Sequence, residues 1–168
     1  MGRWRPPAPR SSPYITPAGF RRLQDELNTL WQERAEVVQK LSEAAAEGDR
    51  SENAEYIYRK KQLREMDRRI RYLQKRIPDL KVVHDRPAAC DRVFFGATVT
   101  LETGDGGEVA YRIVGADEFD PGRNWISVDS PMARAMLKRR LDEAFTVRLP
   151  NGTGEFVVID ISYASDGG

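Results

Sequence analysis

Apolar residues in the first half of the chain recur at alternating intervals of three and four residues. The members of this series are Phe20, Leu23, Leu27, Leu30, Val37, Leu41 and Ala44. Arg34 occupies a place where the spacing calls for another apolar residue. Such spacing is typical of the a and d positions of a coiled coil. Thr16 is a favourable N-cap, Pro17 suits the first helical position, and Gly48 interrupts the pattern, so one long helix is predicted between them.

A second series of the same kind predicts a helix from about Glu52 to Leu80. Its members are Tyr56, Leu63, Met66, Ile70, Leu73, Ile77 and Leu80. Pro78 makes the last turn uncertain. Two helices of about 30 residues, each roughly 45 Å long, should fold back as an antiparallel coiled-coil hairpin over residues 14–80. Such a hairpin is too narrow to enclose a pocket, so chemistry is expected at its tip. Trp31, beside the seam, is expected to be partly buried.

The second half of the chain is rich in β-branched and aromatic residues, which favour strands. Strands are predicted at 93–103, 109–116, 125–129, 145–149 and 155–163, with turns at 104–107 and 150–152. Ser130 can cap a short helix that begins at Pro131 and continues over residues 132–140. The fold class is therefore α+β with two domains: the helical hairpin, and a small antiparallel sheet with one helix over residues 92–163.

Three segments lie outside these two predicted domains. Residues 1–13 hold four prolines and three arginines and are predicted to be a disordered tail. Residues 81–91 contain Pro87 and loose polar residues and are predicted to be a linker. Residues 164–168 form a second short tail.

Composition excludes several classes of protein. The 168 residues contain no run of 18 apolar residues, and no apolar stretch follows the first arginines, so neither a membrane span nor a secretory signal is expected. Cys90 and His84 are the only residues of their types, which excludes an internal disulfide and a Cys-rich zinc module. The net charge of +1 divides into +6 for residues 1–90 and −5 for residues 91–168, which suggests two modules with different partners.

The predicted hairpin tip carries four carboxylates, from Glu47, Asp49, Glu52 and Glu55. Their spacing fits two hypotheses. Asp49 and Glu52 have the spacing of a capping box at a helix N-terminus. Alternatively, the same pair offers oxygen ligands to Mg²⁺, which takes six, so another macromolecule or a substrate would have to complete the site.

The second predicted helix carries a line of cations on the face opposite the apolar seam. The line consists of Lys61, Arg64, Arg68, Arg71 and Lys75, spaced by 3, 4, 3 and 4 residues. Five cations with no acid among them should attract a polyphosphate without base specificity. An ordinary solvated face, or a face that binds protein, is the alternative.

Three segments carry a resemblance to a known family. Residues 48–56, GDRSENAEY, resemble the tip signature of the bacterial transcript cleavage factors, the Gre family. Residues 93–97, VFFGA, and 129–135, DSPMARA, resemble that family's C-terminal motifs in the expected order. The resemblance covers residues 14–163, and the basic line with Leu30 and Trp31 is more similar to the GreB branch than to the GreA branch.

The resemblance implies a fold and a function. It implies an FKBP-like C-terminal domain that binds RNA polymerase at the rim of the secondary channel, and a hairpin that reaches the active centre. There, Asp49 and Glu52 would help to hold a second Mg²⁺ ion and to position a water for hydrolysis of backtracked RNA. The factor would then be no enzyme itself but a monomeric, cytoplasmic activator of the polymerase, with no tightly bound cofactor of its own and no membrane partner.

The resemblance also implies roles for further residues. The residues that would support the tip are Ser51, Asn53, Glu55 and Tyr56. The residues that would contact the 3′ end of the nascent RNA are Lys61, Arg64, Arg68, Arg71 and Lys75. The residues that would dock on RNA polymerase are Ser130, Pro131, Met132 and Arg134. Two alternatives remain: a channel regulator that binds polymerase without stimulating cleavage, and a coiled-coil module that binds nucleic acid or acts as a chaperone.

Overall fold

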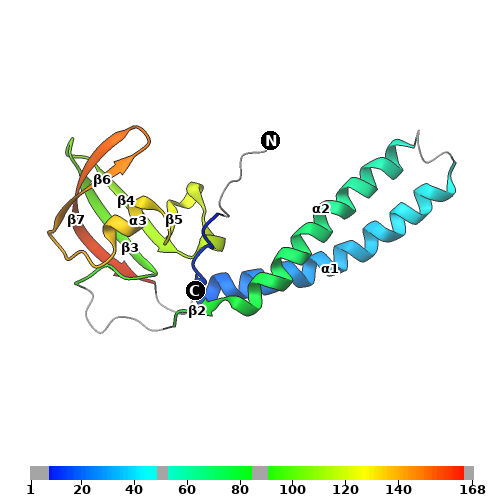
Figure 1. Cartoon of the computed structure of the whole chain (residues 1–168), viewed down its shortest axis with the longest axis horizontal. Helices are drawn as coiled ribbons and strands as arrows, with labels where there is room; N and C mark the ends of the chain where they lie inside the picture. Colours follow the sequence, from blue (N-terminus) through cyan, green and yellow to red (C-terminus); the bar gives the residue numbers. More distant parts are fainter. Residues whose placement is uncertain (1–7, 49–52, 85–90, 165–168) are drawn as a thin grey trace, which may run out of the picture. The chain divides into compact units, whose positions relative to one another are not determined.

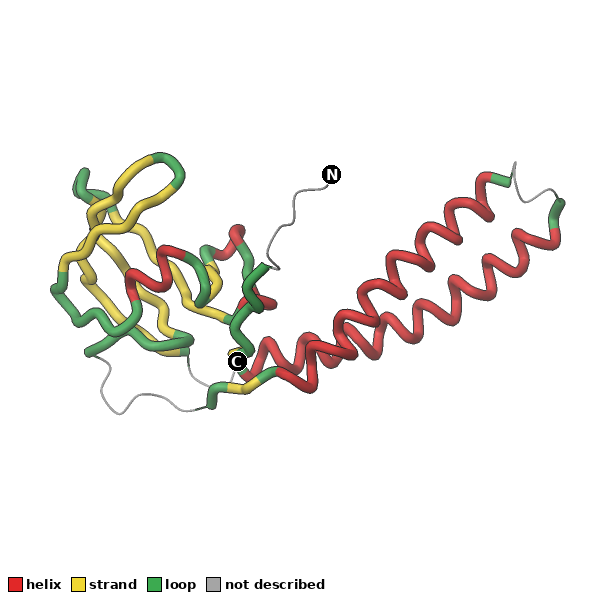
Figure 2. The backbone as a smooth tube through the Cα atoms, viewed as in Figure 1, coloured by secondary structure: helices red, strands yellow, loops and turns green. Residues whose placement is uncertain are grey.

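The computed structural model describes residues 8–48, 53–84 and 91–164. It divides into two compact units, Ala18–Leu80 and the combination of Met1–Pro17 with Lys81–Gly168, which Figures 1 and 2 show as a helical part and a part rich in strands. No helix among the described residues has the length and apolar character needed to cross a membrane.

The helical unit is the predicted antiparallel hairpin. It consists of α1 (Pro17–Ala46) and α2 (Ala54–Arg76), followed by the short 3₁₀ helix η1 (Ile77–Asp79). The seam buries the predicted residues Leu23, Val37 and Ala44 of α1 and Met66, Ile70 and Leu73 of α2. Burial of these side chains drives the pairing of two helices that are otherwise polar.

Polar contacts cross the hairpin beside the seam. Arg34, the interruption in the apolar series, donates from Nε to Asp67 Oδ1 at 2.6 Å. This hydrogen bond, assisted by the charge of Asp67, raises the pKa of the Arg34 guanidinium. Nearer the base, Arg69 donates to both carboxylate oxygens of Glu26 at 2.6 and 3.0 Å. Both ion pairs join α1 to α2 and therefore favour one register of the two helices.

Two details of the helices differ from the sequence-based expectation. The helix α2 begins at Ala54 rather than Glu52, and its regular part ends at Arg76, because Pro78 lies in the 3₁₀ turn that follows. Trp31, expected to be partly buried, is 47% exposed. Its neighbour Leu30 is half-buried at the seam, whereas the Trp31 indole lies on the outer surface.

The other unit is built on a five-stranded sheet. Its strands are β3 (Ala97–Thr103), β4 (Glu108–Val114), β5 (Trp125–Ser127), β6 (Ala144–Leu149) and β7 (Gly152–Tyr163), in the order β5-β4-β3-β7-β6. All neighbours are antiparallel except β4 and β5, which pair in parallel, so the prediction of a purely antiparallel sheet is wrong at this edge. The core lies between the sheet and the single helix α3 (Pro131–Met136), where Leu101, Ile113, Ala133 and Met136 are fully buried.

The helix α3 is shorter than predicted. It ends at Met136, and Lys138 takes a left-handed backbone conformation with φ of 68°, so the helix does not continue to Arg140.

A second, two-stranded sheet corrects the predicted tail and linker. The strands β1 (Tyr14–Ile15) and β2 (Lys81–Val82) pair in parallel, so the predicted linker begins with a strand. Pro13 accepts a hydrogen bond from the Lys81 backbone N–H at 2.8 Å. The Ser12 backbone N–H donates to Asp129 at 2.8 Å, and its hydroxyl donates to the same carboxylate. The predicted disordered tail is therefore wrong for Ser12 and Pro13, while residues 1–7, 85–90 and 165–168 lie outside the described part of the chain.

A buried carboxylate fastens β1 to the main sheet. Glu118, in the 3₁₀ helix η2 (Ala116–Glu118), is 4% exposed. It accepts hydrogen bonds from the Thr16 N–H at 3.1 Å, the Thr16 hydroxyl, and the Gly115 N–H at 2.8 Å. The backbone comes so close here that a Cβ on Gly115 would lie 2.1 Å from the carbonyl oxygen of Tyr14. Only glycine permits this approach.

We expect Gly115→Ala to destabilise this unit by at least about 1–3 kcal/mol, because the added methyl group must push β1 away from Glu118. The measurement is urea-induced unfolding together with amide hydrogen exchange in β3 and β4. Gly104→Ala is the matched control: its Cβ would meet no atom closer than 3.8 Å, and a change below about 0.5 kcal/mol is expected. Equal stability of the two variants would contradict the role given to this contact.

Candidate functional site

The N-terminus of α2 is capped by Asn53. The Asn53 side-chain oxygen accepts from the Tyr56 N–H at 3.1 Å, and its amide nitrogen donates across the hairpin to the carbonyl oxygen of Ala44 at 2.7 Å. One side chain thus satisfies a free donor of α2 and gives the Ala44 carbonyl oxygen of α1 a second hydrogen bond, beside the one from the Glu47 N–H at 3.3 Å. The capping-box hypothesis, with Asp49 as N-cap and Glu52 at N3, is therefore wrong, since the cap lies four residues later.

The predicted tip residues fall into two groups. Asp49, Ser51 and Glu52 lie outside the described residues, so the structure does not place the predicted metal ligands. Glu55 and Tyr56 lie in the first turn of α2. The exposed Glu55 carboxylate accepts from Arg59 Nε at 2.9 Å, and the Lys60 ammonium lies 5.8 Å from the centre of the Tyr56 ring. Both contacts join residues one turn apart within α2, and the support of the tip by these residues stays a prediction.

Two groups of cations on α2 differ in whether they form ion pairs. Arg59 and Arg69 are paired with carboxylates. The five residues of the basic line, by contrast, are all exposed, and none of them forms an ion pair within the part of the chain that the structure describes. They are Lys61, Arg64, Arg68, Arg71 and Lys75. At 1.5 Å per residue the line is about 21 Å long. The structure thus leaves these five predicted cations exposed on one helix, and their contact with RNA stays a prediction.

The predicted docking residues gather at the start of α3, where their burial differs. Ser130 is the N-cap, and its hydroxyl accepts from the Ala133 N–H at 3.2 Å. Met132 is 7% exposed and belongs to the core. Pro131 and Arg134 are exposed, so they are the two members available to a partner.

Asp129, directly before this group, was not among the predicted site residues. Its carboxylate holds the backbone and side chain of Ser12, which ties the N-terminal segment to the β5–α3 loop. No sequence signal pointed to this bond, because it joins residues 117 positions apart.

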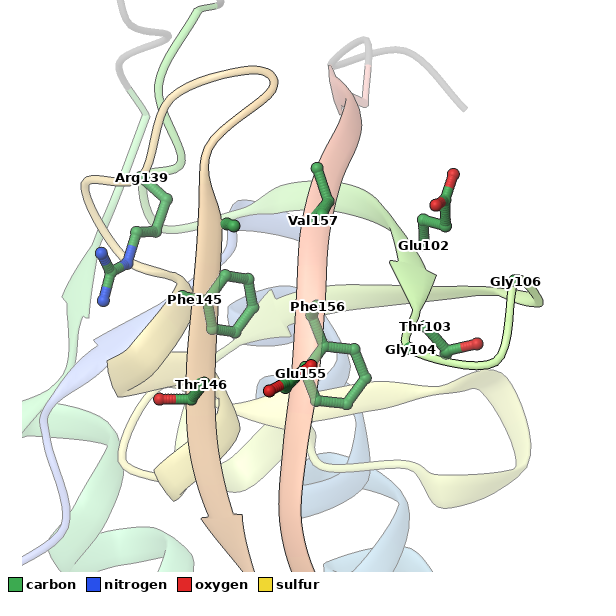
Figure 3. Close-up of a pocket in the computed structure, with 11 residues that line it drawn as sticks. Glu102, Thr103, Gly104, Gly106, Arg139, Phe145, Thr146, Glu155, Phe156 and Val157 are labelled. Atoms are coloured by element: carbon green, nitrogen blue, oxygen red, sulfur yellow. The ribbon is translucent and has the colours of Figure 1, made fainter.

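An open groove of about 750 Å³ lies on the strand-rich unit (Figure 3). The rings of Phe145 and Phe156 stack at 5.7 Å beside it. Its one cation, Arg139, is already bound to Glu143 and to the carbonyl oxygen of Ala135, each at 2.9 Å. A hydrogen bond from the backbone N–H of Arg140 holds the pKa of Glu143 below its ordinary value, and the hydrogen bond from the Arg139 side chain adds to this effect. The groove contains none of the predicted site residues.

Among residues 8–48, 53–84 and 91–164, no cluster of three or more His, Cys, Asp or Glu side chains could hold a metal ion. The candidate Mg²⁺ ligands therefore remain the two tip carboxylates that the sequence predicts.

Comparison with known proteins assigns both halves of the chain. Residues 13–82 match the family model "Transcription elongation factor, N-terminal", and residues 87–163 match "Transcription elongation factor, GreA/GreB, C-term". A protein of Xanthomonas axonopodis pv. citri named transcription elongation factor GreB is 59% identical over 98% of this chain and 99% of its own length. Proteins of the same name from Pseudomonas aeruginosa and Haemophilus ducreyi are 55% and 52% identical, over 97% and 90% of this chain and 98% and 94% of theirs.

We expect Asn53→Ala to loosen the hairpin next to the tip, because both the cap of α2 and the bond to Ala44 are lost. A cost of about 0.5–2 kcal/mol corresponds to amide exchange at Tyr56 and Ile57 that is roughly 2–30 times faster. Asn53→Asp is the matched control: it keeps an acceptor for Tyr56 but has no donor for Ala44, so an intermediate rate is expected. Unchanged exchange in Asn53→Ala would show that Asn53 does not hold this end of the hairpin.

Proposed function

Since this chain belongs to the GreA/GreB family of transcription elongation factors, we propose that it binds RNA polymerase and stimulates Mg²⁺-dependent cleavage of backtracked RNA. Family membership implies interaction with RNA polymerase in general. The finer proposal is that the factor contributes carboxylates to the polymerase's own active centre, from within the secondary channel, and is no nuclease by itself. It would work in the cytoplasm, where bacterial transcription takes place.

The observation that carries this proposal is the position of Asp49 and Glu52 in the connection between two long, paired helices. The helix α1 ends at Ala46 and α2 begins at Ala54, so Asp49 and Glu52 belong to the short segment of sequence that joins the two helices. The N-cap of α2 is Asn53, and the role proposed for Asp49 and Glu52 is therefore metal binding and not capping of this helix.

The donor set suits a shared magnesium ion. Carboxylate oxygens are hard ligands of the kind that Mg²⁺ prefers, and two residues leave most of its six positions to polymerase acids, RNA and water. When bound, the ion would make a water molecule more acidic and stabilise charge on the phosphate. The contribution of Asp49 and Glu52 would be to hold and orient; the bond that breaks is a phosphodiester of RNA bound to polymerase.

The basic line supplies the second part of the proposal. Five unpaired cations along about 21 Å of α2 would hold the extruded 3′ segment through its phosphates, with no preference for sequence. In the strand-rich unit, the exposed Pro131 and Arg134 would contact polymerase, with Ser130 and Met132 holding α3 in place.

We expect the double variant Asp49→Asn/Glu52→Gln to bind RNA polymerase normally but to lose stimulation of cleavage. The loss should be at least the roughly 10–100-fold that disturbing a metal site's supporting carboxylates costs. The assay follows 3′-end-labelled RNA in a stalled, backtracked complex with Mg²⁺ present.

Glu47→Gln is the matched control, since it removes a neighbouring exposed carboxylate and should leave cleavage unchanged. Equal cleavage by the double variant and the wild type would remove the metal-ligand role. Polymerase binding without cleavage by the wild type would favour the binding-only regulator.

We expect Arg68→Gln to weaken binding of a single-stranded oligoribonucleotide and to lower the slope of log K against log salt by about 0.7, because one phosphate contact is lost. Fluorescence anisotropy over a salt series measures both quantities. Arg148→Gln makes the same change of charge on an exposed residue of β6 and should leave the slope unchanged. A slope that falls equally in both variants would mean that RNA responds to net charge and not to the line.

A further inference from the structure

Trp31 is a large aromatic side chain of α1 that lies outside the seam, with 47% of its area exposed. Single exposed apolar residues are common and need no function. What distinguishes this indole is how it is held and what lies beside it.

A chain of two contacts ties Trp31 to α2. The Arg34 guanidinium lies over the indole, 5.9 Å from the ring centre. The same guanidinium donates to Asp67 at 2.6 Å. Trp31 is therefore fixed on the side of the hairpin where Asp67 lies. Arg34, positioned by its ion pair, restricts the indole by a cation–π contact.

Asp67 lies beside the basic line, between the line and the seam. Arg64 precedes it by three residues, Arg71 follows by four and Arg68 by one, and residues separated by three or four share a face of a helix. The contacts through Arg34 and Asp67 therefore place Trp31 on the side of the hairpin that Arg64 and Arg71 share with Asp67. An exposed aromatic ring next to a strip of unpaired cations is the combination that single-strand binding surfaces use: cations follow the phosphates, and rings stack on the bases.

We infer that Trp31 is a stacking platform for a base of single-stranded RNA whose phosphates lie on the basic line. This inference rests on the RNA contact in the proposed function and adds a residue that touches a base. Because every base has a π face, the contact contributes affinity without sequence preference. It also contributes affinity that salt does not screen, since stacking releases no counterions.

The experiment measures binding of the full chain to a labelled single-stranded oligoribonucleotide by anisotropy over a salt series. Trp31→Leu keeps an apolar side chain but removes the ring, and its affinity should fall at least fivefold at every salt concentration with an unchanged salt slope. Trp31→Phe keeps a ring and should retain most of the affinity. Val38→Ala, seven residues further along α1 and 38% exposed, is the control for loss of apolar surface and should bind like the wild type.

Each failure has its own signature. If Trp31→Leu binds like the wild type while Arg68→Gln lowers the slope, the stacking inference is overturned and the phosphate contact stands. If Trp31→Phe is as weak as Trp31→Leu, the ring is not a platform. If the wild type shows no salt-dependent binding, the RNA contact itself falls and the inference with it, whereas the cleavage assay on Asp49 and Glu52 still tests the metal proposal. Trp31→Leu that loses affinity for polymerase but not for RNA would assign the indole to a protein contact.

Discussion

Every exposed feature of the helical unit depends on one narrow apolar seam. A pair of helices has no second layer to shield it, and Leu23, Val37, Met66, Ile70 and Leu73 are the larger side chains that the seam buries. Both helices are polar on their other faces, and neither would be expected to persist alone in water. The arrangement of the basic line along α2 therefore depends on the seam that holds this helix in place.

The packing of the two helices determines which cations of α2 are paired with an acid and which are not. Arginines next to the seam, such as Arg69, reach acids on the other helix and fix the register of the hairpin. Cations on the outer face form no ion pair within the described part of the chain and stay available to a polyanion. Arg34 belongs to the first kind, yet it also holds Trp31, so one ion pair serves the register of the hairpin and the placement of an exposed ring.

The sequence predicts the parts of the molecule that have a period. Heptad spacing predicted the two helices of the hairpin and the line of cations along the second helix. Segments rich in β-branched and aromatic residues predicted most strands of the sheet. Features that do not repeat along the sequence were missed or predicted wrongly. Asp49 and Asn53 are both residue types that cap helices well, and spacing alone favoured Asp49, which is not the N-cap of α2. The parallel pairing of β5, the two-residue strands β1 and β2, and the burial of Glu118 depend on contacts between distant residues. The family motifs predicted the candidate site, and the structure added Trp31 and Asp129.

The pairing of β1 with β2 has a consequence for how the molecule can vary. The chain leaves the strand-rich unit at Ile15 and returns at Lys81, and these residues belong to neighbouring, paired strands. The whole hairpin is therefore an insertion between two adjacent points. Adding or removing one heptad in each helix would change its reach by about 10 Å while leaving the seam in phase and the anchoring strands untouched. Reach is thus a quantity that evolution or design can adjust in steps, independently of the unit that carries the sheet.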